Sequence, residues 1–134
     1  MTAFSLRIIT PDGVRFDGQA EELIVRTTTG DMGFLARHAN CVAPLGMGRA
    51  TVVVEGQKRY GACIGGMVSV VDGAVSLVPT TFEWAEDIDV SRVERSWEKA
   101  QAVLQNKNAT DTDIRLAQAR LRRALVRKSV ANIK

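Results

Sequence analysis

The chain has few of the residues that build enzyme active sites. Among its 134 residues are one histidine, two cysteines and only 5% aromatic residues. It also lacks the phosphate-loop pattern GxxxxGK(S/T), the zinc pattern HExxH and the nucleophile pattern GxSxG. These absences argue against P-loop nucleotidases, zinc peptidases and serine or cysteine hydrolases. The sequence therefore favours a binding or mechanical module over a catalyst.

The cysteines and the histidine show no pattern of a metal or redox site. Cys41 and Cys63 stand in apolar surroundings without a CxxC pair, so we expect two buried free thiols in a reducing compartment. His38 has no evident set of neighbouring ligands and is expected to be structural or exposed. We expect no metal and no required cofactor.

Long apolar runs are also absent. No segment approaches the roughly 20 apolar residues of a membrane-spanning helix. Arg7 interrupts the apolar stretch Phe4–Ile9, which argues against a signal peptide. We expect a soluble intracellular protein that docks on a membrane complex at most, without inserting into the bilayer.

Glycine is missing from residues 84–134, and this absence divides the chain. Before residue 84, the sequence contains about eight to ten short β-type segments with no helical segment between them. Turns such as Pro11-Asp12-Gly13 and Asp72-Gly73 separate these segments. The pattern predicts an N-terminal antiparallel β-sandwich or flattened barrel over residues 1–86. With few aromatic residues, its core must be mainly aliphatic.

Other glycines in this part predict local features of the backbone. Gly30-Asp31-Met32-Gly33 is expected to form a turn that leads into a loop over residues 34–40. Gly65-Gly66 predicts a bulge or a close backbone approach. The Gly-Met-Gly at residues 46–48 lies between strands and does not open a helix, so it is not a dinucleotide-binding fingerprint.

From Val90 onward the apolar residues follow helical spacing. The stripe of the first predicted helix consists of Val90, Val93, Trp97, Ala100, Val103 and Leu104. After a polar loop at residues 105–112, the second stripe consists of Ile114, Ala117, Leu121, Ala124 and Leu125. Alanines let two helices lie close but bury little apolar area. Residues 87–134 are therefore predicted to form a C-terminal antiparallel two-helix hairpin with reversible docking.

Charge is distributed unevenly between the two parts. Residues 1–86 carry seven Lys/Arg and nine Asp/Glu, a net charge of −2, whereas residues 87–134 carry eleven and six, a net charge of +5. Between residues 115 and 128 there is no negative charge and there are six positive ones, at Arg115, Arg120, Arg122, Arg123, Arg127 and Lys128. This basic run suits an acidic partner or is a solvated basic face.

Carboxylates cluster where the two parts meet, at Glu83, Glu86, Asp87 and Asp89. Asp89 is a plausible N-cap of the first helix, and Asp87 adds negative charge near its positive end. The alternative, a small enzyme with a carboxylate site, would need a cleft at this junction.

The order and spacing of several motifs resemble one family along essentially the whole chain. TPDGVRFDGQAEELIV at residues 10–25, GDMGFLARHAN at 30–40, IGGMVSVVDGAVSLV at 64–78 and EDIDVSRV at 86–93 are similar to the epsilon subunits of bacterial F-type ATP synthase. The chain departs from that pattern at Arg37, where glycine is usual, at Asn40, where proline is usual, and at Ile64, where serine is common.

The resemblance implies a non-catalytic rotor subunit of a proton- or sodium-translocating synthase. It implies that residues 1–86 bind the gamma subunit and the ring of c subunits on the cytoplasmic face of the membrane. It further implies that the regulatory hairpin, when extended, meets the beta and alpha subunits and blocks ATP hydrolysis. The basic run from Arg115 to Lys128 would then contact an acidic loop of beta.

Some members of the family bind ATP on the folded hairpin through an Ile/Leu-Asp-x-x-Arg-Ala motif. The resemblance implies ATP as a regulatory ligand here, with contacts from Glu83, Ile88, Asp89, Arg92, Lys99, Arg123 and Arg127. The motif is matched over residues 88–92 and departs at Val93, and Lys99 stands where the family has arginine.

The basic second helix also allows a different class of function, nucleic-acid binding. The basic second helix could belong to a stand-alone nucleic-acid-binding domain. Its basic run lacks interleaved aromatic residues, and the predicted loop is longer than a helix-turn-helix turn. The sequence therefore predicts no nucleic-acid partner.

Overall fold

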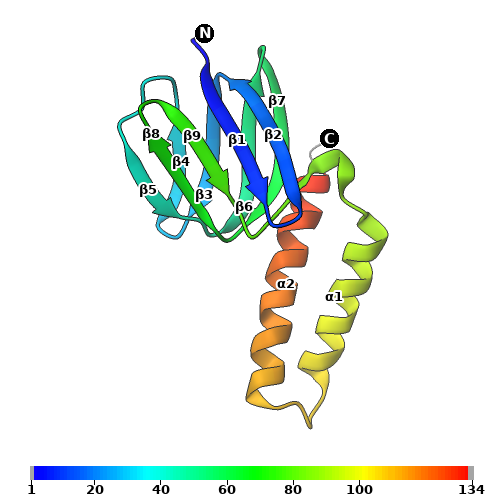
Figure 1. Cartoon of the computed structure of the whole chain (residues 1–134). Helices are drawn as coiled ribbons and strands as arrows, with labels where there is room; N and C mark the ends of the chain where they lie inside the picture. Colours follow the sequence, from blue (N-terminus) through cyan, green and yellow to red (C-terminus); the bar gives the residue numbers. More distant parts are fainter. Residues whose placement is uncertain (1, 133–134) are drawn as a thin grey trace. The chain divides into compact units, whose positions relative to one another are not determined.

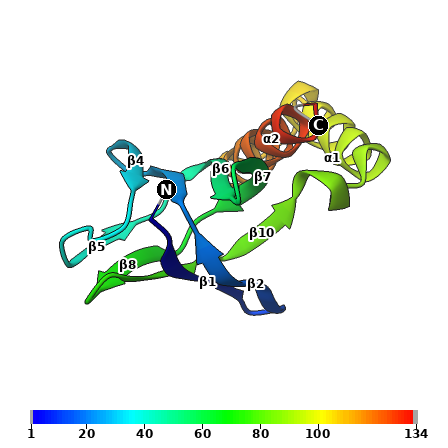
Figure 2. The ribbon, with the colours of Figure 1, turned by 90° about the horizontal axis from the view of Figure 1, so that it is seen from above.

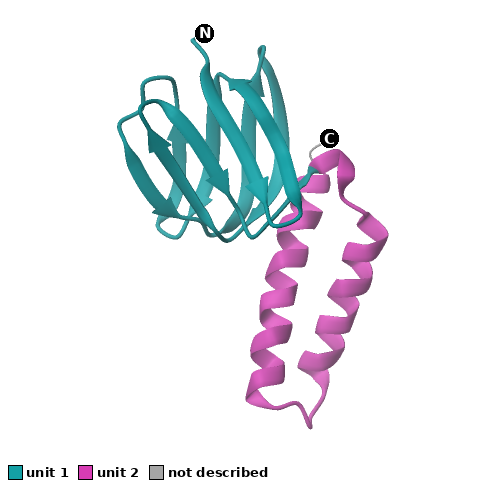
Figure 3. Ribbon diagram, in the orientation of Figure 1, with its two compact units in different colours: residues 1–84 teal, residues 85–134 magenta. Residues whose placement is uncertain are grey.

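The structure, a computed structural model, describes residues 2–132 and consists of two compact units, Met1–Trp84 and Ala85–Lys134 (Figure 3). Within the described residues, the first unit has ten strands: β1 (Phe4–Thr10), β2 (Gly13–Ala20), β3 (Glu22–Thr27), β4 (Gly30–Phe34), β5 (Cys41–Pro44), β6 (Met47–Val54), β7 (Gln57–Ile64), β8 (Met67–Val71), β9 (Ala74–Val78) and β10 (Thr81–Trp84). The second unit has a short 3-10 helix, η1 (Ala85–Asp87), and two helices, α1 (Val90–Gln105) and α2 (Asp111–Ala131).

The ten strands of the described chain form two five-stranded sheets that lie face to face (Figures 1 and 2). The strand order is β2-β1-β9-β8-β5 in one sheet and β10-β7-β6-β3-β4 in the other. The predicted sandwich and strand number are confirmed. The expected antiparallel pairing is wrong at one place, because β1 and β9 are parallel, with Leu6 opposite Val75.

The core between the sheets is mainly aliphatic, as the low aromatic content predicts, and also includes Phe4, Phe34, Phe82 and Trp84. Alternate residues of β1 are buried, so that Leu6 and Ile8 point inward while their neighbours face outward. Leu23, Val52 and Leu77 from three other strands are also fully buried. Together these side chains give the sandwich one continuous core.

Strand β2 at the edge of one sheet is tied to β10 at the edge of the other. The Arg15 Nε group donates to the Phe82 carbonyl oxygen at 3.3 Å, and the Trp84 indole N–H donates to the Arg15 carbonyl oxygen at 3.0 Å. The Arg59 guanidinium lies 3.8 Å from the centre of the Trp84 ring. These contacts close one side of the sandwich and fix the last residue of the unit.

The tightest turns use left-handed backbone, as predicted for Asp72-Gly73. Asp72 and Gly73 have φ values of 49° and 82° between β8 and β9, which fits a type I′ turn. Gly66, at φ 94°, confirms the predicted close approach, because a Cβ there would collide with the Val78 carbonyl oxygen. Arg37, by contrast, holds a φ of 65° with a non-glycine side chain.

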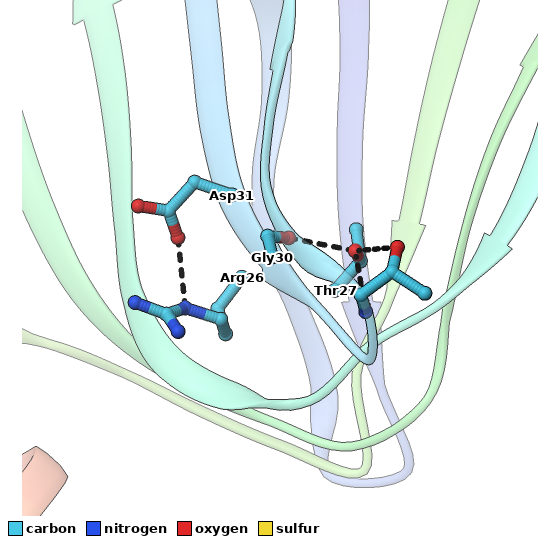
Figure 4. Close-up of polar contacts among 5 residues, drawn as sticks. Arg26, Thr27, Gly30 and Asp31 are labelled. Atoms are coloured by element: carbon cyan, nitrogen blue, oxygen red, sulfur yellow. Dashed lines mark hydrogen bonds and ion pairs between the residues drawn. The ribbon is translucent and has the colours of Figure 1, made fainter.

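The turn predicted at Gly30–Gly33 is wrong, because these residues belong to β4. The chain reverses instead at Thr28-Thr29, where the Thr27 hydroxyl donates to the Gly30 carbonyl oxygen at 2.7 Å and accepts from the Thr29 N–H at 3.3 Å (Figure 4). Beside this turn, the Arg26 Nε group pairs with an Asp31 carboxylate oxygen at 2.8 Å. Hydrogen bonds of the Thr27 hydroxyl therefore stabilise the reversal, which was predicted at the glycines of residues 30–33.

In the second unit, α1 and α2 pack together as the predicted hairpin. Their buried residues include Val93, Ala100, Ala117 and Ala124, so the seam is built largely from small side chains. Leu125 was placed in the buried stripe, and this was wrong, since its side chain is 51% exposed.

Side chains cap the start of both helices. The predicted N-cap of α1 is confirmed, because Asp89 Oδ1 accepts from the Arg92 N–H at 3.1 Å. Thr110 and Asp113 form a reciprocal capping box at the start of α2. Neither α1 nor α2, nor any other helix within residues 2–132, is long and apolar enough to cross a membrane.

Candidate functional site

A cationic hollow lies within the helical unit. It has a volume of about 410 Å³ and is lined by Arg92, Arg95, Ser96, Lys99 and Arg120. Four of these residues come from α1 at positions i, i+3, i+4 and i+7, which fall on one face of a helix. Arg120 comes from α2. We refer to these five residues as the cationic hollow.

Within residues 2–132, no ion pair neutralises the positive charges of the cationic hollow. Arg92, Arg95, Lys99 and Arg120 form no ion pair with any carboxylate within residues 2–132. Elsewhere in the same unit, Lys128 pairs with Glu94 at 3.0 Å and lies 5.9 Å from the Trp97 ring centre. The hollow therefore concentrates uncompensated positive charge, the condition that attracts an anion.

The residues predicted to bind ATP are only partly gathered there. Arg92 and Lys99 line the hollow. Asp89 caps α1, and Ile88 is buried beside that cap. Arg123 and Arg127 lie on α2, three and seven positions after Arg120, and both are half-buried.

One residue predicted to bind ATP lies in the sandwich unit, and three residues of the cationic hollow were not predicted as ligand contacts. Glu83 lies in β10 of the first unit, where it is half-buried. Arg95 and Ser96 were not predicted as ligand contacts, and Arg120 was predicted only as a partner contact. The spacing of Arg95 three residues after Arg92 was a signal that could have found it.

The basic run of α2 divides into side chains of different exposure. Arg115, Arg120 and Arg122 are exposed. Arg123 and Arg127 are half-buried, and Lys128 already has Glu94 as its partner. The exposed arginines are therefore the members of the predicted partner-binding set that are most accessible to an acidic surface.

The cysteines and the histidine occupy the sandwich unit. Both thiols are free, and burial raises the pKa of the Cys63 thiol to about 12. Cys41 was expected to be buried but is half-buried, with its Sγ atom 4.0 Å from His38 Nδ1. Among the described residues, no group of three or more His, Cys, Asp or Glu side chains could hold a metal ion.

A second surface, on the sandwich, was not anticipated from the sequence. The outward residues of β5, β8 and β9 form what we call the uncharged face: Val42, Pro44, Met67, Ser69, Val71, Ala74, Ser76 and Val78. None of them carries a charge, and Val42 is 65% exposed. The three strands lie side by side in one sheet (Figure 1). An apolar surface of this kind is typical of a protein–protein contact.

Two family models together match nearly the whole chain. The model described as the beta-sandwich domain of the ATP synthase delta/epsilon chain matches residues 3–85. The model described as the long alpha-helix domain of the same chain matches residues 86–132. The two matches follow one another along the sequence in the order of the two units.

Named relatives support the same relationship. An ATP synthase epsilon chain of Ruminococcus albus is 41% identical over 136 aligned positions, which cover 100% of both chains. The ATP synthase epsilon chain of Bacillus velezensis is 37% identical, with 98% of both chains covered.

Solved structures show that the fold is shared. A chain in the cryo-EM structure of the Euglena gracilis mitochondrial ATP synthase OSCP/F1/c-ring superposes with a TM-score of 0.83 at 23% identity, over 96% of this chain and 81% of that one. A chain in the central stalk and c-ring structure of Tetrahymena thermophila mitochondrial ATP synthase gives a TM-score of 0.59 at 15% identity, over 95% of both. With its two domain matches and its full-length relatives, the chain belongs to the ATP synthase delta/epsilon chain family.

Proposed function

We propose that the chain is the non-catalytic epsilon subunit in the rotor of a bacterial F-type ATP synthase, peripheral to the membrane on its cytoplasmic face. In this role it couples the catalytic head to the c-ring, and its helical hairpin inhibits ATP hydrolysis. One observation carries the proposal: the chain joins two different units. The sandwich has a large apolar core, whereas the helical hairpin packs through small side chains and has a basic surface. A rotor subunit needs a stable domain that binds its neighbours, and a regulatory subunit needs a domain that can change conformation.

The sandwich is the part proposed to bind the gamma subunit and the c-ring. The uncharged face supports this role, because Val42, Met67 and Val71 would leave water on contact with a partner. At roughly 25 cal/mol per Å² of apolar area, such burial can hold a stable contact between subunits. One of the named structural relatives comes from an OSCP/F1/c-ring assembly and the other from a central stalk and c-ring assembly.

The hairpin is the part proposed to inhibit. When extended, it would reach the beta and alpha subunits, and the exposed Arg115, Arg120 and Arg122 would meet an acidic loop of beta. Each exposed ion pair contributes only about 0–1 kcal/mol, so several must act together. The seam supports reversibility, because alanines such as Ala100 and Ala117 bury far less apolar area than leucines would.

Truncation tests the inhibitory role. A chain that ends at Glu86 should still assemble with gamma and the c-ring, because it retains all ten strands of the described sandwich. ATP hydrolysis by the complex should rise, since the inhibitory helices are gone. A full-length variant with Arg115→Gln and Arg122→Gln should give a smaller rise. Unchanged hydrolysis in an assembled, truncated complex would show that the hairpin does not inhibit.

We also propose ATP as a regulatory ligand that stabilises the folded hairpin and so relieves inhibition. A ligand shifts such an equilibrium only by its difference in affinity for the two states. The convergence of Arg92 and Lys99 on the cationic hollow supports this proposal, and Glu83, Ile88, Asp89, Arg123 and Arg127 complete the proposed contact set. Calorimetric titration of the isolated subunit with ATP should give measurable heats that fall in Arg92→Ala and Arg127→Ala. Equal heats in all three proteins would exclude this contact set.

A further inference from the structure

We propose that Arg37 is a specificity-determining contact of the sandwich, which pairs with a carboxylate on the subunit surface that covers the uncharged face. The inference rests on the proposed function of the sandwich and goes beyond it, because it assigns an electrostatic contact at the end of a surface without charge. Arg37 stands where the pattern that this chain resembles usually has glycine, so the contact belongs to this chain. The partner surface is an apolar patch with an acidic side chain at its border.

The first argument is the backbone of Arg37. Its φ of 65° is left-handed, a conformation that costs free energy for residues other than glycine. Within residues 2–132, Glu55 and Asp72 also combine a side chain with a positive φ, but each precedes a glycine in a tight turn between paired strands. Arg37 lies in the loop between β4 and β5, where glycine would adopt the same backbone without strain. The strain therefore points to a use for the arginine side chain.

The second argument is that the fold does not use this side chain. Arg37 is exposed and forms no ion pair within residues 2–132. It lines two adjoining hollows at one end of the sandwich, with volumes of about 570 Å³ and about 270 Å³. Asp72 lines the first hollow and Glu21 the second, yet neither carboxylate pairs with Arg37. The guanidinium group is therefore available to an acidic group from outside the chain.

The third argument is that the loop around Arg37 is held in place. Asn40 Oδ1 accepts from the Asp72 N–H at 2.8 Å, which ties the loop to the turn between β8 and β9. Next to Arg37, the ring centre of His38 lies 4.9 Å from that of Phe34, a buried core residue. A side chain on an anchored loop gives up less conformational freedom on binding than one on a loose loop. This arrangement suits a recognition contact.

The fourth argument is the position of Arg37 at the end of the uncharged face. The first hollow is also lined by Gly73 and Ala74, and Ala74 belongs to the uncharged face. The loop between β4 and β5 and the turn between β8 and β9 lie at the same end of the sandwich (Figure 1). A partner seated on Val71 and Ala74 would therefore reach Arg37 with a side chain at its border. Apolar burial holds such a partner, whereas the charge at the rim favours a carboxylate and repels a cation.

Binding of the full chain to the subcomplex of gamma and the c-ring tests the proposal, with affinity measured at about 50 mM and about 500 mM salt. Arg37→Gln should weaken binding about fivefold at low salt, mainly through slower association, and less than about twofold at high salt, because ion pairs at a rim are screened. Arg37→Glu should weaken it by more than about twentyfold at low salt. Lys58→Gln removes an exposed cation from β7 of the other sheet and is the matched control, which should change nothing.

Arg37→Gly separates recognition from folding. Glycine relieves the left-handed backbone, so this variant should resist denaturant better than the parent chain and still bind about fivefold more weakly at low salt. A purely structural role of Arg37 would move stability and affinity in the same direction. A glycine variant that gains stability and keeps the parent affinity would show that the side chain makes no contact with the partner.

The remaining outcomes distinguish this inference from the proposed function. Parent affinity in Arg37→Gln and Arg37→Glu, or an equal loss in Lys58→Gln, overturns the inference and leaves the role of the sandwich intact. Val42→Glu, on the uncharged face, tests that role and should weaken binding by at least about a hundredfold, because it buries a charge. If Val42→Glu binds like the parent chain, or if the parent chain does not bind, the attachment through this face is wrong and the inference falls with it. Denaturant unfolding of each variant verifies that the sandwich remains folded.

Discussion

The two units of this chain bury different kinds of side chain. The sandwich buries large residues such as Leu6, Ile8 and Phe34 in one continuous core. The helical unit buries mainly small ones, and Ala100, which is fully buried in its seam, exemplifies them. Burial of a large aliphatic side chain contributes roughly 1.5–3 kcal/mol, several times the contribution of an alanine methyl group. Apolar burial therefore stabilises the sandwich more than it stabilises the helical unit.

The difference also appears in the polar contacts. The sandwich is closed by hydrogen bonds between its two sheets, from Arg15 to Phe82 and from Trp84 to Arg15. The helical unit has side-chain caps at the starts of α1 and α2 and an ion pair between Lys128 and Glu94, whereas Arg92, Arg95, Lys99 and Arg120 form no ion pair with a carboxylate within residues 2–132. A ligand or partner that supplies negative charge can therefore change the stability of the helices far more than that of the sandwich.

The largest expected effect is in the sandwich, at Gly66. Gly66→Ala should lower the free energy of unfolding by about 3–4 kcal/mol, because the new Cβ meets the Val78 carbonyl oxygen and the backbone φ of 94° disfavours a side chain. Denaturant unfolding of the full chain measures this loss. Gly33→Ala is the matched control, since a Cβ there has nothing within 4 Å. A similar, small loss in both variants would contradict the close packing at Gly66.

The next effect should be confined to the helices. Ala100→Glu places a charge in the seam and should destabilise the hairpin by about 2–4 kcal/mol while the sandwich remains folded. Circular dichroism at the helical band should show an earlier transition. The fluorescence of Trp84, followed in a Trp97→Phe background, should report an unchanged sandwich. Ala102→Glu, on the exposed side of α1, is the control. Simultaneous loss of both signals would mean that the two units unfold as one.

The sequence predicted local features of the structure well and contacts between distant segments poorly. The turn at Asp72-Gly73 and the Asp89 cap were predictable because neighbouring residues determine each of them. The parallel pairing of Leu6 with Val75 was not, because no local pattern reports a partner so distant in the sequence. The cationic hollow was found in part. Arg92 and Lys99 were expected from the resemblance to the family, Arg92 within its motif and Lys99 outside it, whereas Arg120 required knowledge of which faces of α1 and α2 meet.

A smaller effect is the pH dependence of the sandwich's stability that the Cys63 thiol causes. The pKa of the Cys63 thiol is raised to about 12 in the folded protein from 9.0, so the stability that the protonated thiol contributes is present below pH 9 and is lost as pH rises toward 12. The slope from this group is roughly 1 kcal/mol per pH unit. Unfolding curves between pH 8 and pH 10.5 should show this slope in Cys41→Ala but not in Cys63→Ala. Equal slopes in both variants would mean that Cys63 titrates normally.

The smallest expected effect has the opposite sign. Arg37 has a φ of 65°, where a side chain is strained and glycine is not. Arg37→Gly should therefore raise the free energy of unfolding by about 0.5–1 kcal/mol, measured by denaturant unfolding. Arg37→Ala keeps the Cβ and should give no gain. A loss of stability in the glycine variant would show that the arginine side chain contributes more than its backbone conformation costs.

The parallel pairing of β1 with β9 has a consequence for the synthesis of the chain. During translation β1 can pair with β2 at once, but its other edge waits until Ala74–Val78 has left the ribosome. Contacts between such distant segments slow folding, because a long loop must close before they are rewarded. We therefore expect the sheet to be completed late, when most of the sandwich sequence is already available. Until then, a nascent chain has an open strand edge that chaperones or neighbouring chains can reach.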